Sequence, residues 1–225
     1  MTTIQKHLPW LLPLLCVLAI APLTPGIDLS VERYFFREGH FQNNGFLNFM
    51  YVFGVIPGWI LALGSLGIVI LSYVYPYWKP WRIYALIPLL TMILGAGVVI
   101  DKSFKDHWGR PRPKQIKEFG GHQQFHPFYK PNLNVQPEPA KSFPSGHCSM
   151  GFIFFSLAFA GRRAGKEWVF KLGIALAFIL GTLLAYTRMA QGGHFFSDVF
   201  MSAIIMWWTS LFVNWLVFQE WIYKR

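Results

Sequence analysis

The chain has 225 residues and a net charge of +10; 54% of its residues are hydrophobic and 13% are charged. A soluble domain carries roughly 25% charged residues, so the composition excludes an ordinary soluble protein and indicates an integral membrane protein. The basic balance fits an anionic phospholipid or a phosphorylated substrate. Nucleic acid is not expected as a partner, because the apolar stretches leave little soluble surface.

Six apolar stretches are long enough, or nearly so, to span a bilayer, which takes about 20 helical residues. They cover residues 8–23, 55–75, 83–100, 148–160, 172–186 and 195–218. The first could instead be a cleaved signal peptide, because Lys6 precedes it, but no small-residue cleavage pattern follows. The sequence therefore predicts a single domain over residues 1–225, an all-α polytopic membrane protein with six transmembrane helices.

The polar segments between these stretches differ in character. Residues 27–54 mix charged and aromatic side chains, which predicts a short amphipathic helix at the membrane interface. Residues 101–147 hold eight Lys or Arg and four of the seven histidines, and polar loops of this length are usually functional or disordered. Within this loop, Lys102 and Arg110 could extend an anion-binding site or contact lipid headgroups, and the sequence favours headgroup contacts. The cysteines, Cys16 and Cys148, give no sign of a disulfide framework.

The number of spans determines which loops share a side of the membrane. With six spans, the loop at 101–147 and the short polar break at 187–198 lie on the same side. The opposite side receives both termini and the other basic loops, with nine Lys or Arg and two acids. The positive-inside rule makes that side cytoplasmic. The two polar segments are therefore predicted to build an active site on the outer face.

The polar break places an arginine, a histidine and an aspartate between two apolar stretches. His194 and Asp198 are four residues apart, so on a helix they would share one face. A carboxylate beside a histidine can fix its tautomer and raise its basicity. Arg188 adds a fixed positive charge. Alone, this group could equally be a structural salt bridge at a membrane edge.

Two further motifs in the long loop suit a phosphate group. Lys105 and Arg112 supply fixed cations that match phosphate oxygens. A Pro-Ser-Gly-His sequence places Ser145, Gly146 and His147 at the start of a helix, where free backbone N–H groups form an anion site. The serine adds a hydroxyl, and the glycine permits a close approach of the backbone.

Two histidines beside one phosphate suggest a division of labour. Neutral His194, oriented by Asp198, is expected to attack phosphorus and form a phosphohistidine. Protonated His147 is expected to donate a proton to the leaving oxygen. The charge on the equatorial oxygens would be stabilised by three cations, which are Lys105, Arg112 and Arg188. No carboxylate cluster with metal-ligand spacing accompanies these residues, so neither a metal nor another cofactor is expected.

In order and spacing, these three motifs resemble those of the type 2 phosphatidic acid phosphatase (PAP2) superfamily of membrane lipid phosphatases. Thr187 stands where the family pattern usually has Ser, and it keeps the hydroxyl. The resemblance implies His194 as the nucleophile, Asp198 as its partner and His147 as the general acid. It also implies a set of phosphate ligands, which are Lys105, Arg112, Ser145, Gly146 and Arg188.

Residues 104–113 and 191–199 are also similar to those of bacterial lipid A phosphatases, especially the 4′-phosphatase type. This resemblance implies hydrolysis of lipid A at the outer leaflet of the bacterial inner membrane, with the site facing the periplasm. A phosphatase for phosphatidylglycerophosphate or undecaprenyl pyrophosphate, and a lipid-to-lipid phosphotransferase, are the alternatives. A passive binder or transporter of anionic lipids would leave His147 and Asp198 without a role. The superfamily that the motifs resemble also includes vanadium haloperoxidases. Haloperoxidase activity is disfavoured for this chain, because those enzymes are largely soluble and this chain is predicted to be embedded in a membrane.

Overall fold

The computed structural model describes residues 3–133 and 139–222, and within those ranges it is all helical, with no strand. The α-helices are α1 (Thr3–Ile20), α2 (Thr24–Phe35), α3 (Gly45–Phe53), α4 (Ile56–Val74), α5 (Arg82–Thr91), α6 (Gly146–Phe152), α7 (Phe154–Arg163), α8 (Glu167–Ala190) and α9 (Phe196–Ile222). The 3₁₀ helices are η1 (Ala21–Leu23), η2 (Pro76–Trp81), η4 (Pro113–Gln115) and η5 (Lys117–Phe119). A π-helical segment, η3 (Met92–Lys105), continues α5. The predicted all-α fold is confirmed.

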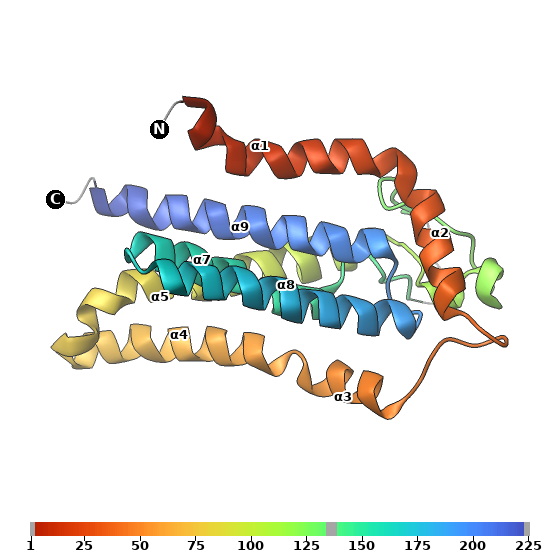
Figure 1. Ribbon diagram of the computed structural model, residues 1–225, viewed down its shortest axis with the longest axis horizontal. Coiled ribbons are helices and arrows are strands. Elements are labelled where there is room, and N and C mark those ends of the chain that lie inside the picture. Colours follow the sequence, from red (N-terminus) through yellow and green to blue (C-terminus); the bar gives the residue numbers. More distant parts are fainter. Residues whose placement is uncertain (1–2, 134–138, 223–225) are drawn as a thin grey trace.

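The long helices lie side by side, with both chain ends at one end of the bundle and with α2 and α3 towards the other (Figure 1). In the described part of the chain, five helical segments are long and apolar enough to cross a membrane. They are His7–Phe35, Gly45–Val74, Pro76–Lys105, Glu167–Ala190 and Phe196–Gln219. The protein is therefore a polytopic membrane protein.

The fourth predicted span is not one of those five segments. It consists of two short helices, α6 and α7, that are divided at Ile153. Both are largely buried among the longer helices. A Cβ atom on Gly151 would lie 2.5 Å from the backbone nitrogen of Gly181, so α6 and α8 approach closely at two glycines. The count of six spans is not confirmed.

The segment predicted to hold one short interfacial helix, residues 27–54, contains most of α2 and all of α3, joined by a connection at residues 36–44. Its position at the membrane interface stays a prediction. Through η1, α2 continues α1, and α3 begins a new membrane segment at Gly45, ten residues before the predicted start. The Oδ1 atom of Asn44 caps α3 by accepting a hydrogen bond from the backbone N–H of Leu47 at 2.9 Å. Asp28 and Glu32 made this segment look interfacial, yet both are fully buried.

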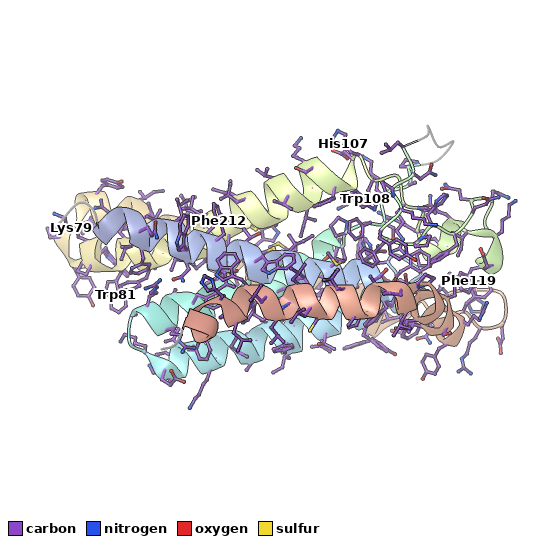
Figure 2. The ribbon with its side chains drawn as sticks, turned by 90° about the horizontal axis from the view of Figure 1, so that it is seen from above. Lys79, Trp81, His107, Trp108, Phe119 and Phe212 are labelled. Atoms are coloured by element: carbon purple, nitrogen blue, oxygen red, sulfur yellow. The ribbon has the colours of Figure 1, made fainter. Side chains whose placement is uncertain are left out.

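The two ends of the bundle collect different loops. Lys79 and Trp81 lie at one end, and His107, Trp108 and Phe119 lie at the opposite end (Figure 2). At the first end, the loop between α7 and α8 reaches η2, since Lys166 Nζ lies 5.4 Å from the centre of the Trp81 ring.

At the second end, the long loop meets the polar break that joins α8 to α9. The backbone N–H of Lys114 donates to the carbonyl of Gly192 at 3.2 Å. The loop also closes on itself, because the N–H of Ser142 donates to the carbonyl of Arg110 at 2.9 Å. The prediction that these two polar segments meet is confirmed.

Candidate active site

The Pro-Ser-Gly-His motif forms the start of α6. The Oγ atom of Ser145 caps the helix by accepting from the N–H of Cys148 at 3.4 Å. The N–H of Ser145 donates to Ser202 Oγ on α9 at 2.8 Å, and the side chain is fully buried. These bonds fix the first turn, which carries Gly146 and His147. Since the hydroxyl of Ser145 is already engaged, its role as a phosphate ligand stays a prediction.

The ring of Tyr51 on α3 joins two of the predicted site residues. It stacks on the ring of His147, with 4.5 Å between centroids and 17° between planes. The guanidinium of Arg188 lies 4.8 Å from the centre of the same tyrosine ring. The first turn of α6 and the last turn of α8 are thus brought together at α3. Sequence reasoning missed Tyr51, because its segment was assigned to the interface.

Lys105 ends η3 directly beside the start of α6. Its Nζ atom lies 3.2 Å from Asp101 Oδ1, one helical turn earlier. A Cβ atom added to Gly146 would lie 3.0 Å from the same Nζ atom. The lysine therefore lies next to the first turn of this helix, as the phosphate-binding hypothesis requires.

Arg188 is held by the turn that follows α8. Its Nη1 atom donates to Gln191 Oε1 at 2.8 Å. A Cβ atom on Gly193 would lie 2.1 Å from Arg188 Nη2, so any side chain at this position would displace the guanidinium. Gly192 turns the chain with a φ of 60°, in the left-handed region that favours glycine.

The ring of His194 is oriented by a backbone carbonyl as well as by Asp198. His194 Nδ1 lies 2.6 Å from the carbonyl oxygen of Ser142 and 3.8 Å from Asp198 Oδ2. A carbonyl oxygen can only accept a hydrogen bond, so Nδ1 carries the proton in the neutral ring. Nε2 is therefore the nitrogen with a free lone pair. Ser142 Oγ donates to Asp198 Oδ2 at 2.6 Å, which links the two orienting groups.

Arg110 does not lie among lipid headgroups, and that prediction is wrong. Its side chain is 1% exposed and forms ion pairs with Asp28 and Asp198. Nη2 donates to Asp28 Oδ2 at 2.8 Å, and Nη1 donates to Asp198 Oδ1 and Ser197 Oγ. The physical reason is charge balance, because buried carboxylates require a counter-charge.

Burial and nearby cations keep both histidines neutral. Burial lowers the pKa of His194 to about 4, and the negative charge of Asp198 opposes this only in part. Burial also lowers the pKa of His147 to about 4, with further lowering by the charges of Arg188, Lys105 and Arg112. The half-buried Arg112 is among the charges that act on both rings, so it belongs to the same site.

The predicted site residues therefore converge at one end of the bundle, from η3, the long loop, α6, α8 and α9. Within residues 3–133 and 139–222, no group of three or more His, Cys, Asp or Glu could hold a metal ion. The metal-free mechanism stays a prediction. The residues that sequence reasoning missed are Asp28, Tyr51, Arg110 and Ser142.

Known proteins that are similar to this chain include lipid A phosphatases and a lipid phosphate phosphatase. The PAP2 superfamily matches residues 84–222. A lipid A 4'-phosphatase of Francisella tularensis subsp. novicida is 30% identical over 207 residues, which cover 87% of this chain and 88% of that protein. A lipid A 4'-phosphatase of Rhizobium leguminosarum is 32% identical over 128 residues, covering 56% of this chain and 50% of that protein. Lipid phosphate phosphatase 2 of Arabidopsis thaliana is 35% identical over 136 residues, covering 54% and 47%.

No solved structure gives a significant match. The superfamily match spans most of the chain and includes every motif that carries the site, from Lys105 to Asp198. The first of these relatives extends the similarity over nearly the whole chain. The chain therefore belongs to the PAP2 superfamily, and it is a phosphatase that acts on lipid phosphates.

Proposed function

We propose that the protein removes a phosphate from lipid A at the outer leaflet of the bacterial inner membrane, through a phosphohistidine on His194. The observation that carries this proposal is the convergence of two neutral imidazoles and three cations at the start of α6. Lipid A as the substrate is supported by the Francisella and Rhizobium relatives. The positive-inside rule supports a site that faces the periplasm, because the opposite end carries the basic loops around Lys79 and Lys166.

In the proposed reaction, Nε2 of His194 attacks phosphorus and the bond from phosphorus to the lipid oxygen breaks. His147 donates its proton to that oxygen, so the lipid leaves as an alcohol. Water then attacks phosphorus, the N–P bond breaks, and His147 accepts the proton of the water. The Nδ1–H bond to Ser142 keeps the attacking nitrogen unprotonated at the start of the cycle.

The three cations would stabilise the negative charge of the transition state. Lys105, Arg112 and Arg188 would contact the equatorial oxygens, where charge must be stabilised. Free N–H groups at the start of α6, including that of Gly146, would add hydrogen bonds. A bound phosphate would also raise the pKa of His147, because its negative charge opposes the cations that lower it.

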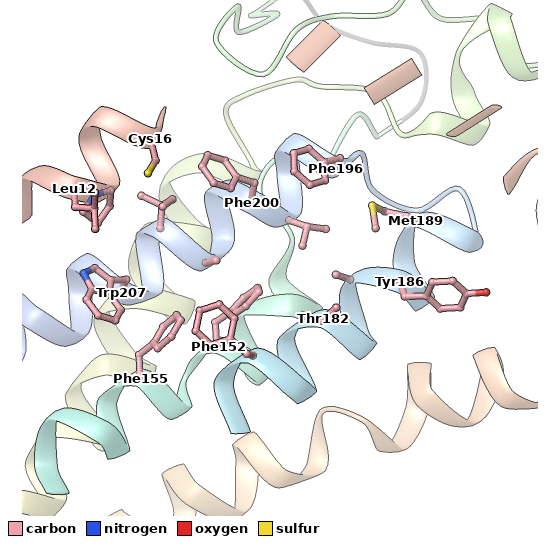
Figure 3. A pocket seen from close by; sticks show the side chains of 16 residues that line it. Leu12, Cys16, Phe152, Phe155, Thr182, Tyr186, Met189, Phe196, Phe200 and Trp207 are labelled. Atoms are coloured by element: carbon pink, nitrogen blue, oxygen red, sulfur yellow. The ribbon is translucent and has the colours of Figure 1, made fainter. Parts of the chain in front are cut away.

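Two cavities support a lipid substrate. The first, of about 520 Å³, has Lys105, Gly146 and His147 at its polar side and Val55 and Trp59 among its apolar walls. This combination suits an amphiphile with a phosphate at one end. The second, of about 620 Å³, lies between α1, α7, α8 and α9 and is lined by apolar side chains (Figure 3). Separate apolar spaces suit a lipid with several acyl chains.

The test is a panel assay with the purified protein in detergent and EDTA. Lipid A, phosphatidylglycerophosphate, undecaprenyl pyrophosphate and phosphatidic acid are offered separately, and free phosphate is measured. We expect release to be fastest from lipid A and to be abolished by His194→Ala. His107→Ala, which removes an exposed histidine, is the matched control and should retain full activity.

Each part of the proposal can fail separately. Full activity of His194→Ala would refute the phosphohistidine. Faster release from another lipid of the panel would refute the lipid A assignment and leave the chemistry intact. Labelled phosphate that appears on an acceptor lipid instead of in water would identify a phosphotransferase.

A further inference from the structure

A buried ion-pair network lies next to the predicted catalytic dyad. Arg110 forms ion pairs with Asp198 and with Asp28 on α2, and all of these side chains are fully buried. Asp28 also accepts two hydrogen bonds from Ser197, from its N–H at 2.8 Å and from its hydroxyl at 2.7 Å. The first membrane segment is therefore tied to the start of α9, where Asp198 lies.

Arg110 is fixed on every side. Its Nε atom donates to the carbonyl of His126 at 2.8 Å. The guanidinium carbon lies 4.4 Å from the centre of the Phe195 ring and 5.6 Å from that of Phe125. A guanidinium with these contacts has little conformational freedom. Its hydrogen bond therefore fixes the position of Asp198 Oδ1.

The other carboxylate oxygen of Asp198, Oδ2, connects this network to His194, the predicted nucleophile. Oδ2 accepts hydrogen bonds from Ser142 Oγ at 2.6 Å and from the backbone N–H of Phe195 at 2.8 Å. The carbonyl of Ser142 in turn accepts from His194 Nδ1 at 2.6 Å. A continuous chain of contacts thus runs from Asp28 through Arg110, Asp198 and Ser142 to the imidazole.

We infer that Arg110 and Asp28 are positioning residues, which hold the ring of His194 for attack and balance the charge of Asp198; this inference rests on the proposed function. In this inference, neither Arg110 nor Asp28 contacts the substrate. Two carboxylates and one guanidinium give this network a net charge of −1, close to the imidazole. Removing the guanidinium would leave two uncompensated carboxylates, which favour the protonated imidazole. Other charged or titratable groups that act on this network or on the two histidines are Glu32, Lys105, Arg112, His147, Cys148 and Arg188.

The experiment measures kcat, KM and the pH profile of phosphate release in three variants. For Arg110→Gln we expect kcat to fall about tenfold or more, because misplacing a reacting group by about 1 Å can cost about 100-fold, with KM changed less than twofold. The acid limb of kcat/KM should move up by about one pH unit. Asp28→Asn should move that limb down. The double variant restores the net charge, so its acid limb should return to the wild-type position.

Matched controls separate positioning from general damage. Arg33→Gln removes an exposed arginine from α2, and Asp106→Asn removes an exposed aspartate that pairs with Lys141. Both should match the wild type. Inhibition by inorganic orthovanadate, a phosphate analogue, reports whether each variant keeps a folded phosphate site.

The outcomes decide the inference. An unchanged kcat and acid limb in Arg110→Gln would overturn it. A lower kcat with an unmoved limb in all three variants would also overturn it, because a structural role alone predicts that result. If Arg110→Gln does not fold, the acid limb of kcat/KM in Asp28→Asn is the test: a downward shift supports the inference, and an unmoved limb overturns it. Failure of the proposed function looks different, because the wild type would then release no phosphate or His194→Ala would stay active.

Discussion

The buried imidazole of His194 should make the protein less stable in acid. Burial lowers its pKa from 6.5 to about 4. Between these two values the folded protein binds fewer protons than the unfolded chain. Stability should therefore be unaffected by this group above pH 6.5 and should fall as the pH drops towards 4.

The size of this effect follows from the shift in pKa. A complete shift corresponds to about 3 kcal/mol, and at pH 5 about 2 kcal/mol of it should be expressed. For a chain of this length, about 2 kcal/mol lowers Tm by roughly 4–8 °C. The effect is large enough to measure by thermal unfolding in detergent.

The informative variant is His194→Gln, which removes the titrating group and keeps an N–H donor for the carbonyl of Ser142. Between pH 8 and pH 5, the wild type should lose about 2 kcal/mol more stability than this variant. His107→Gln removes an exposed histidine and should follow the wild type. An equal loss in the wild type and His194→Gln would refute the argument.

Three other substitutions test parts of the site. Gly193→Ala should displace the guanidinium of Arg188 and lower kcat/KM for phosphate release about 10- to 100-fold, the cost of one hydrogen bond to a charged group; normal kinetics would contradict the close approach. Ser142→Ala removes a donor to buried Asp198 and should cost about 1–3 kcal/mol of stability, measured by Tm. Glu32→Gln should keep the activity and should not lower Tm, because the buried carboxyl of Glu32 has no hydrogen-bond partner among the described residues; a loss of phosphate release would show that this carboxyl takes part.

The motifs of the candidate site could be predicted from the sequence because charge is costly in an apolar chain. Arg188 and His194 lie in a short polar break between two apolar stretches, and His147 directly precedes another, so their presence required an explanation. The order of the apolar stretches also predicted that these residues lie on the same side of the membrane. The contacts among them did not follow, because a stack such as that of Tyr51 on His147 depends on tertiary packing.

The supporting network could not be predicted because its members are far apart in the sequence. Asp28 and Arg110 are 82 residues apart, and each alone looks like a headgroup contact. One signal was present, since Asp28 and Glu32 are four residues apart and so share a helix face. Two acids on one face of a continuous helix indicate a buried partner more strongly than a membrane interface. The interfacial assignment of residues 27–54 hid this signal.

The charge state of the two histidines makes a final prediction about pH. The mechanism needs His194 neutral and His147 protonated, but in the free protein the pKa of each is about 4. Near neutral pH the missing proton must therefore arrive with the substrate, whose second ionisation has a pKa of about 6. A monoanionic phosphate that passes its proton to His147 creates the reactive state.

The rate constant kcat/KM should then be bell-shaped. Its acid limb should lie near pH 4, where His194 becomes protonated, and its alkaline limb should begin at about pH 6, where the monoanion is lost. His147→Asn should lower the rate and remove the alkaline limb, since the proton no longer has an acceptor in the site. A profile that is flat from about pH 5 to 9 would contradict both histidine assignments, because no step would then depend on their protonation.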